Sequence, residues 1–384
     1  MQIILLSGGA GKRRSPLSNE LYSKQFLRLL KQEDGTRESM IQRVCRQIQN
    51  AVPDVPVTVA TGREQTSMIR RQLGKDVNIS IGPCWRDTFP AIALVSAYLH
   101  EVRGIPLGEA IAICPADPYV DEDYFRAVLH LLEEAEREDA GKLVLMGIEP
   151  TYPSEKYGYI IPVPQEKQSK VHAFKEKTDK ETAEKYIAQG ALWNSGVFAF
   201  KLGYALDQAR ELLGYTDYED LFNRYEELSK ISFDYAVVEK ESSIVVQRYS
   251  GTWLDIGTWN TFAEVMPEHT IGRVTLDEIC TNVHAVNTLP MPILCMGLKD
   301  VVVAASPEGI LIADKERSSA MKPYAERLHT PVMYRRSLGA SSALSMPRRR
   351  ASRSRSRLGP DARLPIICTN GVMKRGRSSK AVAG

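Results

Sequence analysis

The feature that most constrains the fold of this chain is an alternation between short apolar runs and longer amphipathic stretches. Runs with the length of buried strands lie at residues 3–6, 57–60, 77–81, 110–114 and 143–147. Between them, residues 40–48 and 91–102 repeat apolar side chains at helical spacing. Such alternation predicts a doubly wound α/β fold, in which helices cover both faces of a sheet.

The pattern continues to about Pro267 and then changes. Further strands are predicted at residues 157–163, 171–174, 196–200 and 243–248, and helices at 180–189 and 206–213. From residue 270 to 314 the apolar runs are shorter and separated by turns, which predicts a small all-β extension closed by a helix at 316–328. We therefore predict an α/β domain at 1–267, a β extension at 268–328 and a basic, disordered tail at 329–384.

The tail differs from the rest of the chain in charge. Residues 331–384 contain thirteen Lys or Arg and one Asp, about +12, although the whole chain of 384 residues carries only +3. The remaining residues therefore carry about −9. The Arg/Ser run at 348–357 is typical of a solvated, disordered segment. Because it lacks interleaved aromatic residues and the body is acidic, we do not expect nucleic-acid binding.

Neither a membrane segment nor a cysteine site is indicated. No apolar run reaches the roughly 18 residues that a membrane helix needs, and the chain opens on its first predicted strand rather than on a signal segment. We therefore expect a cytoplasmic location and no membrane partner. The six cysteines are scattered without C-x-x-C spacing, which predicts reduced thiols rather than a metal centre.

A glycine-rich turn with positive charge follows the first predicted strand. Glycines lack a Cβ, so the backbone can turn tightly and present its N–H groups to a phosphate. Nearby cationic side chains would neutralise that phosphate. The residues of this motif are Leu6, Gly8, Gly9, Gly11, Lys12, Arg13 and Lys24. The spacing fits neither a Walker P-loop nor a dinucleotide-binding G-x-G-x-x-G turn, and a plain strand-to-helix turn remains an alternative.

Two aspartates are candidates for a metal site. Asp117 follows the predicted strand 110–114, at the sheet edge where open α/β folds bind ligands. Asp255 stands among glycines and aromatic residues. Two carboxylates that converge on one Mg²⁺ would suit transfer at a triphosphate, because this ion prefers oxygen ligands. Each aspartate, taken singly, could instead cap a turn or a helix.

Together these stretches resemble the sugar-1-phosphate nucleotidylyltransferases. Residues 8–17 with Lys24-Gln25-Phe26 are similar to the G-G-x-G-x-R-L-x-P-L…K-Q-F signature, residues 115–117 to P-A-D-H, and residues 253–259 to W-x-D-V-G-S-W. The resemblance implies a Rossmann-like, doubly wound mixed sheet of the GT-A-like type. It also implies that Asp117 and Asp255 bind the metal, and that Arg13 and Lys24 stabilise the triphosphate.

The resemblance extends to the sugar-phosphate half of that family. Residues 157–160, 174–177, 193–198 and 233–240 match its blocks in the same order. The family implies that Gly158, Glu176 and Asn194 contact the sugar and that Lys177 meets its phosphate. Each of these side chains, considered alone, could be structural.

Residues 82–92 resemble the G-R-[ND]-T-x-P-A-I block of mannose-1-phosphate guanylyltransferases. Arg86, Asp87 and Thr88 would then contact the nucleotide, although Asp87 or Thr88 could also cap the helix that follows. The implied reaction joins GTP and mannose 1-phosphate, with Mg²⁺, into GDP-mannose and diphosphate. Other sugar 1-phosphates with UTP or dTTP remain alternatives, as does a binder without catalysis.

The chain departs from that family at several positions. Arg14 and Ser15 replace Leu-Trp, Pro118 replaces the His after P-A-D, and Thr178 replaces the Pro after E-K. We expect Arg14 to reach solvent or the triphosphate. Residues 282–324 resemble the family's β-helical extension, whose role there is structural and oligomeric, so a homodimer is left open.

The tail begins like the cupin module of longer relatives and then diverges. Residues 332–336 start that module's M-Y-E-x-R segment, and Arg/Ser-rich sequence follows. Codons allowed for residues 363–384, read in a neighbouring frame, can encode a sequence that resembles a cupin metal-ligand strand. We therefore predict a frameshift near Arg335, a tail without selected function, and no isomerase activity.

Overall fold

The computed structural model describes residues 1–9, 14–19, 22–138, 141–163, 168–175, 178–327, 334–337 and 340–343. The chain divides into two compact units, Met1–Leu344 and Ser345–Gly384, and the first contains all of the described residues. Several predictions lie outside the described residues, namely those for Gly11, Lys12, Arg13, Glu176, Lys177 and the Arg/Ser run. The three-part division at residues 267 and 328 stays a prediction.

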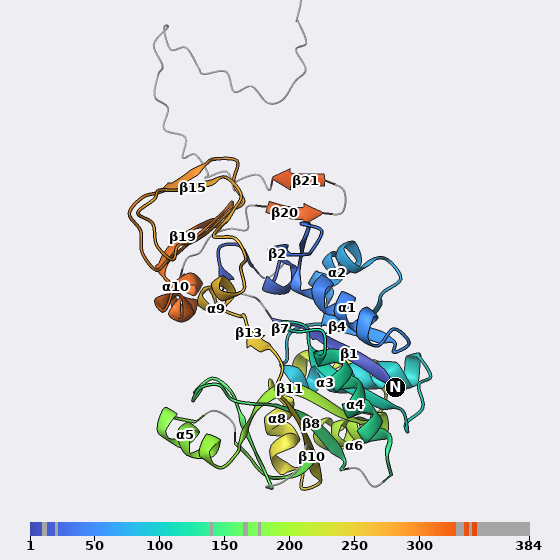
Figure 1. Ribbon diagram of the computed structural model, residues 1–384. Helices are drawn as coiled ribbons and strands as arrows, with labels where there is room; N and C mark the ends of the chain where they lie inside the picture. Colours follow the sequence, from blue (N-terminus) through green and yellow to red (C-terminus); the bar gives the residue numbers. More distant parts are fainter. Residues whose placement is uncertain are drawn as a thin grey trace, which may run out of the picture. The chain divides into compact units, whose positions relative to one another are not determined.

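Among the described residues, nine strands form one mixed sheet (Figure 1). In spatial order the strands are β5 (Asn78–Gly82), β4 (Val57–Gly62), β1 (Gln2–Ser7), β6 (Ala110–Pro115), β11 (Leu192–Lys201), β8 (Leu143–Ile148), β12 (Ile244–Tyr249), β10 (Gln168–Lys175) and β9 (Tyr159–Pro162). The strands from β5 to β6 are parallel, whereas β11 runs antiparallel to both β6 and β8. The predicted fold class, a doubly wound mixed sheet, is confirmed.

Two separate cores lie on the two faces of this sheet. Along β1, Ile3 and Leu5 join one core, and Ile4 joins the other. The first core receives α1 (Met40–Ala51), α2 (Thr66–Leu73) and α4 (Tyr124–Glu136). The second receives α3 (Thr88–Ala97), α6 (Leu202–Leu213), α7 (Tyr218–Asn223) and α8 (Phe233–Ala236). Successive side chains of a strand point to opposite faces of the sheet. A sheet that is covered on both faces therefore requires strands whose residues are all apolar, without alternating polar positions.

The observed elements include most of the predicted ones, with differences at several places. The helix predicted at 91–102 is α3 followed by a π-helical turn, Tyr98–Val102. The strand predicted at 196–200 is the end of β11, which begins at Leu192. Helix α4 was not predicted. The helix α5 (Lys180–Ala188) lies where it was expected.

The extension after Pro267 consists of parallel rungs that end in one antiparallel strand, β19 (Gly309–Asp314). Its strands are β14 (Thr270–Ile271), β15 (Val274–Leu276), β16 (His284–Asn287), β17 (Ile293–Cys295), β18 (Val301–Ser306) and β19. Ala285 pairs in parallel with Thr270 on one side and Val303 on the other, and β15 pairs in parallel with β17. Short strands that stack in this way form the predicted β-helical extension. The closing helix is divided into a 3₁₀ turn, Arg317–Ala320, and α10 (Lys322–Arg327).

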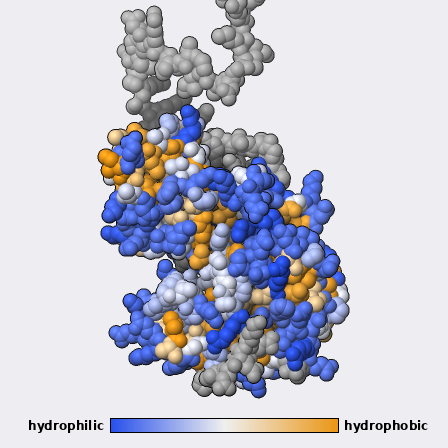
Figure 2. Space-filling model, in the orientation of Figure 1, coloured by the Kyte–Doolittle hydropathy of each residue, from blue (hydrophilic) through white to orange (hydrophobic). Residues whose placement is uncertain are grey.

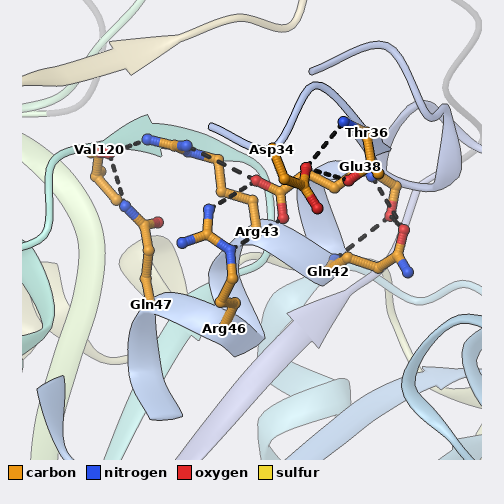
Figure 3. A network of polar contacts seen from close by, with 9 residues as sticks. Asp34, Thr36, Glu38, Gln42, Arg43, Arg46, Gln47 and Val120 are labelled. Atoms are coloured by element: carbon orange, nitrogen blue, oxygen red, sulfur yellow. Dashed lines mark hydrogen bonds and ion pairs between the residues drawn. The ribbon is translucent and has the colours of Figure 1, made fainter. Parts of the chain in front are cut away.

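A polar network fixes the strand that follows Asp117. The small strands concerned are β2 (Leu30–Lys31), β3 (Arg37–Glu38), β7 (Pro118–Val120) and β13 (Trp253–Asp255). The carbonyl oxygen of Val120 accepts hydrogen bonds from Gln47 at 3.0 Å and from Arg43 at 3.2 Å (Figure 3). Arg46 in turn binds the buried carboxylate of Glu38 through two nitrogens. Helix α1 therefore holds β7 in place from one side.

Figure 2 shows that polar residues cover much of one face of the molecule, whereas apolar residues gather over the extension. Exposed apolar side chains there are Ile279, Met291, Leu294, Met296, Ile310 and Ile312. Within the described part of the chain, no helix has the length and apolarity needed to cross a bilayer.

Candidate active site

A cavity of about 610 Å³ opens at the sheet edge where β1, β4 and β6 end. It is lined by all the predicted site residues that the structure describes: Leu6, Gly8, Gly9, Lys24, Arg86, Asp87, Thr88, Asp117, Gly158, Asn194 and Asp255. Segments that are distant in sequence thus meet around one space. The role of each residue in that space stays a prediction.

The start of the glycine turn is held by buried hydroxyl and amide groups. Thr61 donates from its hydroxyl to the carbonyl of Ser7 at 3.0 Å, and the Ser23 hydroxyl donates to the carbonyl of Gly9 at 2.8 Å. Gln65 binds Ser23 at 2.5 Å, and both side chains are fully buried. Gly9 has a φ of 100°, a backbone conformation that residues with a Cβ rarely adopt. The turn is therefore ordered on its strand side by partners from β4 and from the segment before Lys24.

Asp117 and Asp255 lie next to each other because β7 and β13 pair. Asp255 stands opposite Pro118, the residue that follows Asp117. Lys24 Nζ lies 2.5 Å from Asp117 Oδ2. A Cβ built on Gly257 would be 2.8 Å from Asp255 Oδ1 and 3.3 Å from Lys24 Nζ, so the amino group lies beside both carboxylates. Burial alone would raise the pKa of Asp117, but Lys24 and Arg14 together hold that pKa below its usual value.

This pair of carboxylates fits a hard divalent cation. Their oxygens are the ligands that Mg²⁺ prefers, and this ion commonly takes only one or two carboxylates, with water and phosphate oxygens as its other ligands. Among the residues described, no group of three or more His, Cys, Asp or Glu side chains could hold a metal. The donor set therefore matches a cation that shares its coordination with a phosphate substrate.

Arg14 does not reach solvent, so that part of the expectation is wrong. Its side chain is only 4% exposed, and its guanidinium lies 4.4 Å from the centre of the Phe262 ring. It donates a hydrogen bond to the carbonyl of Ile256 and does not line the cavity. The cation–π contact and the carbonyl give the long side chain a buried place where an apolar residue was expected to pack.

The residues predicted to contact the nucleotide, Arg86, Asp87 and Thr88, line the cavity and also stabilise the local structure. Asp87 caps α3, because its carboxylate accepts a hydrogen bond from the backbone N–H of Thr88 at 2.8 Å. The Thr88 hydroxyl accepts from the N–H of Phe233 at 2.8 Å. Arg86 lines the cavity and also donates to the carbonyls of Tyr225 and Glu226. The alternative of a helix cap is therefore confirmed for Asp87, and it does not conflict with a position in the cavity.

At the other end of the cavity, Asn194 is held in one orientation. Its Nδ2 donates to Asp234 Oδ1 at 2.6 Å, and its Oδ1 accepts from the N–H of Gly196 at 3.0 Å. Its own N–H donates to the carbonyl of Gly158 at 2.8 Å. Burial raises the pKa of Asp234, whereas the bond from Asn194 opposes that rise. Ser195 and Gly196 of β11 line this end of the cavity beside Asn194.

Trp85 and Asp234 are among the cavity residues that sequence reasoning did not assign to the site. Trp85 lies against Gly8 and Gly62, and Asp234 orients Asn194. For Asp234 a signal existed, because residue 234 belongs to a motif that matches the sugar half of the resembling family. Trp85 lies in the block at residues 82–92, but its contact with Gly8 and Gly62 joins three segments that are distant in sequence and could not be predicted.

Residues 2–271 match the nucleotidyl transferase family. The mannose-1-phosphate guanylyltransferase of Escherichia coli K12 is 32% identical, with 85% of this chain and 73% of that protein covered. The xanthan biosynthesis protein XanB of Xanthomonas campestris is 30% identical, with 85% and 72% covered. Among solved structures, a protein described as mannose-1-phosphate geranyltransferase from Thermus thermophilus superposes with a TM-score of 0.70. It is 28% identical, and 85% of this chain and 98% of that one are covered.

Proposed function

The chain belongs to the nucleotidyl transferase family and to its mannose-1-phosphate guanylyltransferases, and from this premise we propose that it transfers GMP from GTP to mannose 1-phosphate. The products are GDP-mannose and diphosphate. The observation that carries the proposal is that the described residues of the glycine turn and of the sugar blocks line one cavity with the two aspartates, although these segments are far apart in sequence.

In the proposed reaction, a phosphate oxygen of mannose 1-phosphate attacks the α-phosphorus of GTP in line. The new P–O bond forms as the bond to the bridging oxygen of the β-phosphate breaks, and diphosphate leaves with that electron pair. No covalent enzyme intermediate is needed, because positioning and charge neutralisation account for most of the catalysis in such transfers.

Each part of the cavity has a distinct task in this scheme. Lys24, together with Arg13, neutralises the triphosphate and the departing diphosphate. Asp117 and Asp255 hold Mg²⁺, which when bound neutralises charge on the phosphate oxygens. Lys24 pairs with Asp117 in the structure, so the cluster is ordered before substrates arrive.

The sugar end completes the scheme. Asn194, fixed by Asp234 and Gly196, accepts or donates hydrogen bonds to the hexose hydroxyls. Gly158, which has no side chain, leaves room for the sugar ring of mannose 1-phosphate. Glu176 contacts the sugar, and Lys177 orients the attacking phosphate. At the opposite end of the cavity, the capped first turn of α3, at Asp87 and Thr88, contacts the nucleotide.

Two further proposals concern the setting in which this chemistry occurs. The exposed apolar side chains of the extension, such as Leu294 and Ile312, favour a homodimer formed through that surface. The substrates are small phosphorylated metabolites, which favours a cytoplasmic enzyme.

The test is a panel of sugar 1-phosphates and nucleoside triphosphates assayed for diphosphate release with Mg²⁺. We expect GTP with mannose 1-phosphate to give the highest kcat/KM. A higher kcat/KM for glucose 1-phosphate, or for UTP or dTTP, would establish the rival pairing. Binding of GTP or GDP-mannose in calorimetry, without turnover of any pair, would show a non-catalytic binder.

The variant Asp117→Ala identifies the site within the same assay. We expect diphosphate release to fall by at least about 10³-fold, because one of two metal ligands and the partner of Lys24 are both removed. The thermal midpoint should change little, since Asp117 lines the cavity rather than the core. As a matched control, Asp123→Ala removes an exposed aspartate at the start of α4 and should keep full turnover. Near-normal turnover of Asp117→Ala would contradict the assignment.

A further inference from the structure

Arg14 is a buried cation beside the cavity that has no assigned task. Its side chain is 4% exposed, and in the described part of the chain its Nε has no hydrogen-bond partner. A buried guanidinium nitrogen without a partner is costly, so its retention requires a compensating interaction. Because Arg14 does not line the cavity, that interaction is not direct contact with a ligand in the cavity.

The charge of Arg14 interacts electrostatically with both candidate metal ligands, Asp117 and Asp255. Its guanidinium donates to the carbonyl of Ile256, the residue directly after Asp255, and stacks on Phe262 of α9 (Trp259–Glu264). The pairing of β7 with β13 brings Asp117 next to Asp255. Burial lowers the pKa of Arg14 to about 10, while Asp117 and Asp255 oppose that decrease, so the side chain stays charged at neutral pH.

The formal charges of this cluster cancel among the residues described. Asp117 and Asp255 contribute two negative charges, and Lys24 and Arg14 contribute two positive ones. A divalent cation that approaches these four described residues therefore meets no net charge from them. With an apolar residue at position 14 the same cluster would carry one net negative charge, and in a partly buried site such a charge has a strong effect on cation binding.

We propose that Arg14 is a positioning residue that fixes the Asp255 turn and, by its charge, keeps the free protein from binding a divalent cation tightly, so that the cation enters with the nucleotide. The triphosphate supplies the negative charge that the cluster lacks. Departure of diphosphate removes that charge again, which favours release of the cation together with the product. The inference rests on the proposed function only in its assignment of Asp117 and Asp255 as the cation ligands.

The test measures Mn²⁺ binding to the full chain without nucleotide, by the loss of the free Mn²⁺ electron paramagnetic resonance signal. We expect Arg14→Leu to bind Mn²⁺ about tenfold more tightly than the wild type, and Arg14→Lys to bind it as weakly as the wild type. Circular dichroism and thermal midpoints establish that each variant is folded. If Arg14→Leu fails to fold, Arg14→Met, which retains a long side chain, replaces it.

Two comparisons make the outcome decisive. Lys24→Met removes the other cation and should tighten Mn²⁺ binding similarly. With GTP present, the difference between the wild type and Arg14→Leu should shrink, because the nucleotide then supplies most of the charge. Equal or weaker Mn²⁺ binding by folded Arg14→Leu would overturn the inference. A tightening of Mn²⁺ binding without turnover of any substrate pair would leave the inference standing and sink the proposed function.

Discussion

At the scale of single residues, contact with Trp85 explains why glycine occupies positions 8 and 62, which backbone conformation alone does not explain. Gly62 ends β4 with a φ of −76°, which any residue can adopt. A Cβ on Gly62 would nevertheless lie 3.1 Å from Trp85 Cζ2, and one on Gly8 would lie 2.9 Å from Trp85 Cζ3. The six-membered ring of the indole therefore packs directly on two α-carbons. The neighbouring indole therefore disfavours a larger residue at both positions.

We predict that Gly62→Ala lowers the free energy of unfolding by about 1 kcal/mol, because the added methyl group overpacks the contact with Trp85. In a Trp85→Ala background the same change should be neutral or stabilising, since alanine restricts the unfolded chain more than glycine does. Urea denaturation of the four proteins measures this double-mutant cycle.

Gly108→Ala is the matched control for that cycle. Apart from its two chain neighbours, no described residue has an atom within 4 Å of a Cβ built on Gly108, so this change should be neutral in both backgrounds. An equal cost of Gly62→Ala with and without Trp85 would show that the indole is not the cause.

The residues that could be predicted from the sequence are those whose role depends on short spacing. Gly8, Asp117 and Asp255 each belong to a local motif, and the structure brings all three to one cavity. The contact of Trp85 with Gly62 and that of Arg14 with Phe262 could not be predicted. Both depend on which strands become neighbours, and neither leaves a periodic pattern in the sequence.

At the scale of elements, strand β16 contains a histidine in an unusual environment. His284 is 7% exposed, and its ring centre lies 4.6 Å from that of His269, which precedes β14. Burial, Lys315 and His269 together lower the pKa of His284 to about 4. Burial, a lysine and a second imidazole tilted by 38° thus disfavour protonation, so the folded extension favours neutral His284.

The consequence for stability follows from proton binding. An unfolded histidine takes up a proton below about pH 6.5, whereas folded His284 does so only near pH 4. The unfolded state therefore binds more protons between these values, and stability falls as the pH decreases from 6.5 to 4. We predict that His284 accounts for a loss of about 2 kcal/mol over this range. Thermal midpoints measured across it should fall less in His284→Gln.

His130→Gln provides the comparison for this pH dependence. His130 is an exposed histidine of α4 that pairs with Glu133, and its replacement should leave the acid-dependent loss as in the wild type. If the thermal midpoints of the wild type and of His284→Gln fell equally as the pH decreases, the role given to His284 would be contradicted.

Most elements could be predicted because apolar runs mark strands that are buried on both faces. Helix α4 was missed although Phe125, Val128, Leu131 and Leu132 repeat at helical spacing, so the signal was present. The ribbon of β7 and β13 could not be found in this way. Each of its strands has only three residues, too few for any periodicity, and its register depends on the fold around it.

At the scale of the whole molecule, the extension touches the segment that follows the glycine turn. Ser306, at the end of β18, donates its hydroxyl hydrogen to the carbonyl of Pro16 at 2.6 Å, across 290 residues of sequence. A Cβ on Gly309 would lie 3.7 Å from Pro16 Cβ, so the turn between β18 and β19 packs against the same residue. Trp259 holds the neighbouring carbonyl of Ser15 at 3.1 Å. The extension thereby supports the chain beside the proposed triphosphate site.

We predict that Ser306→Ala raises the KM for GTP by about fivefold while kcat changes less than about twofold. The buried Pro16 carbonyl would lose its donor, at a cost of about 1 kcal/mol, and the segment behind the glycine turn would be less fixed before nucleotide binds. Ser306→Thr keeps the hydroxyl and should restore the KM. Ser319→Ala removes a half-buried serine of the extension whose hydroxyl, among the described residues, bonds to the carbonyl of Glu316, and its KM should equal that of the wild type. A purely structural role of Ser306 would lower the thermal midpoint without changing the KM, and that result would show that the extension does not act on the site.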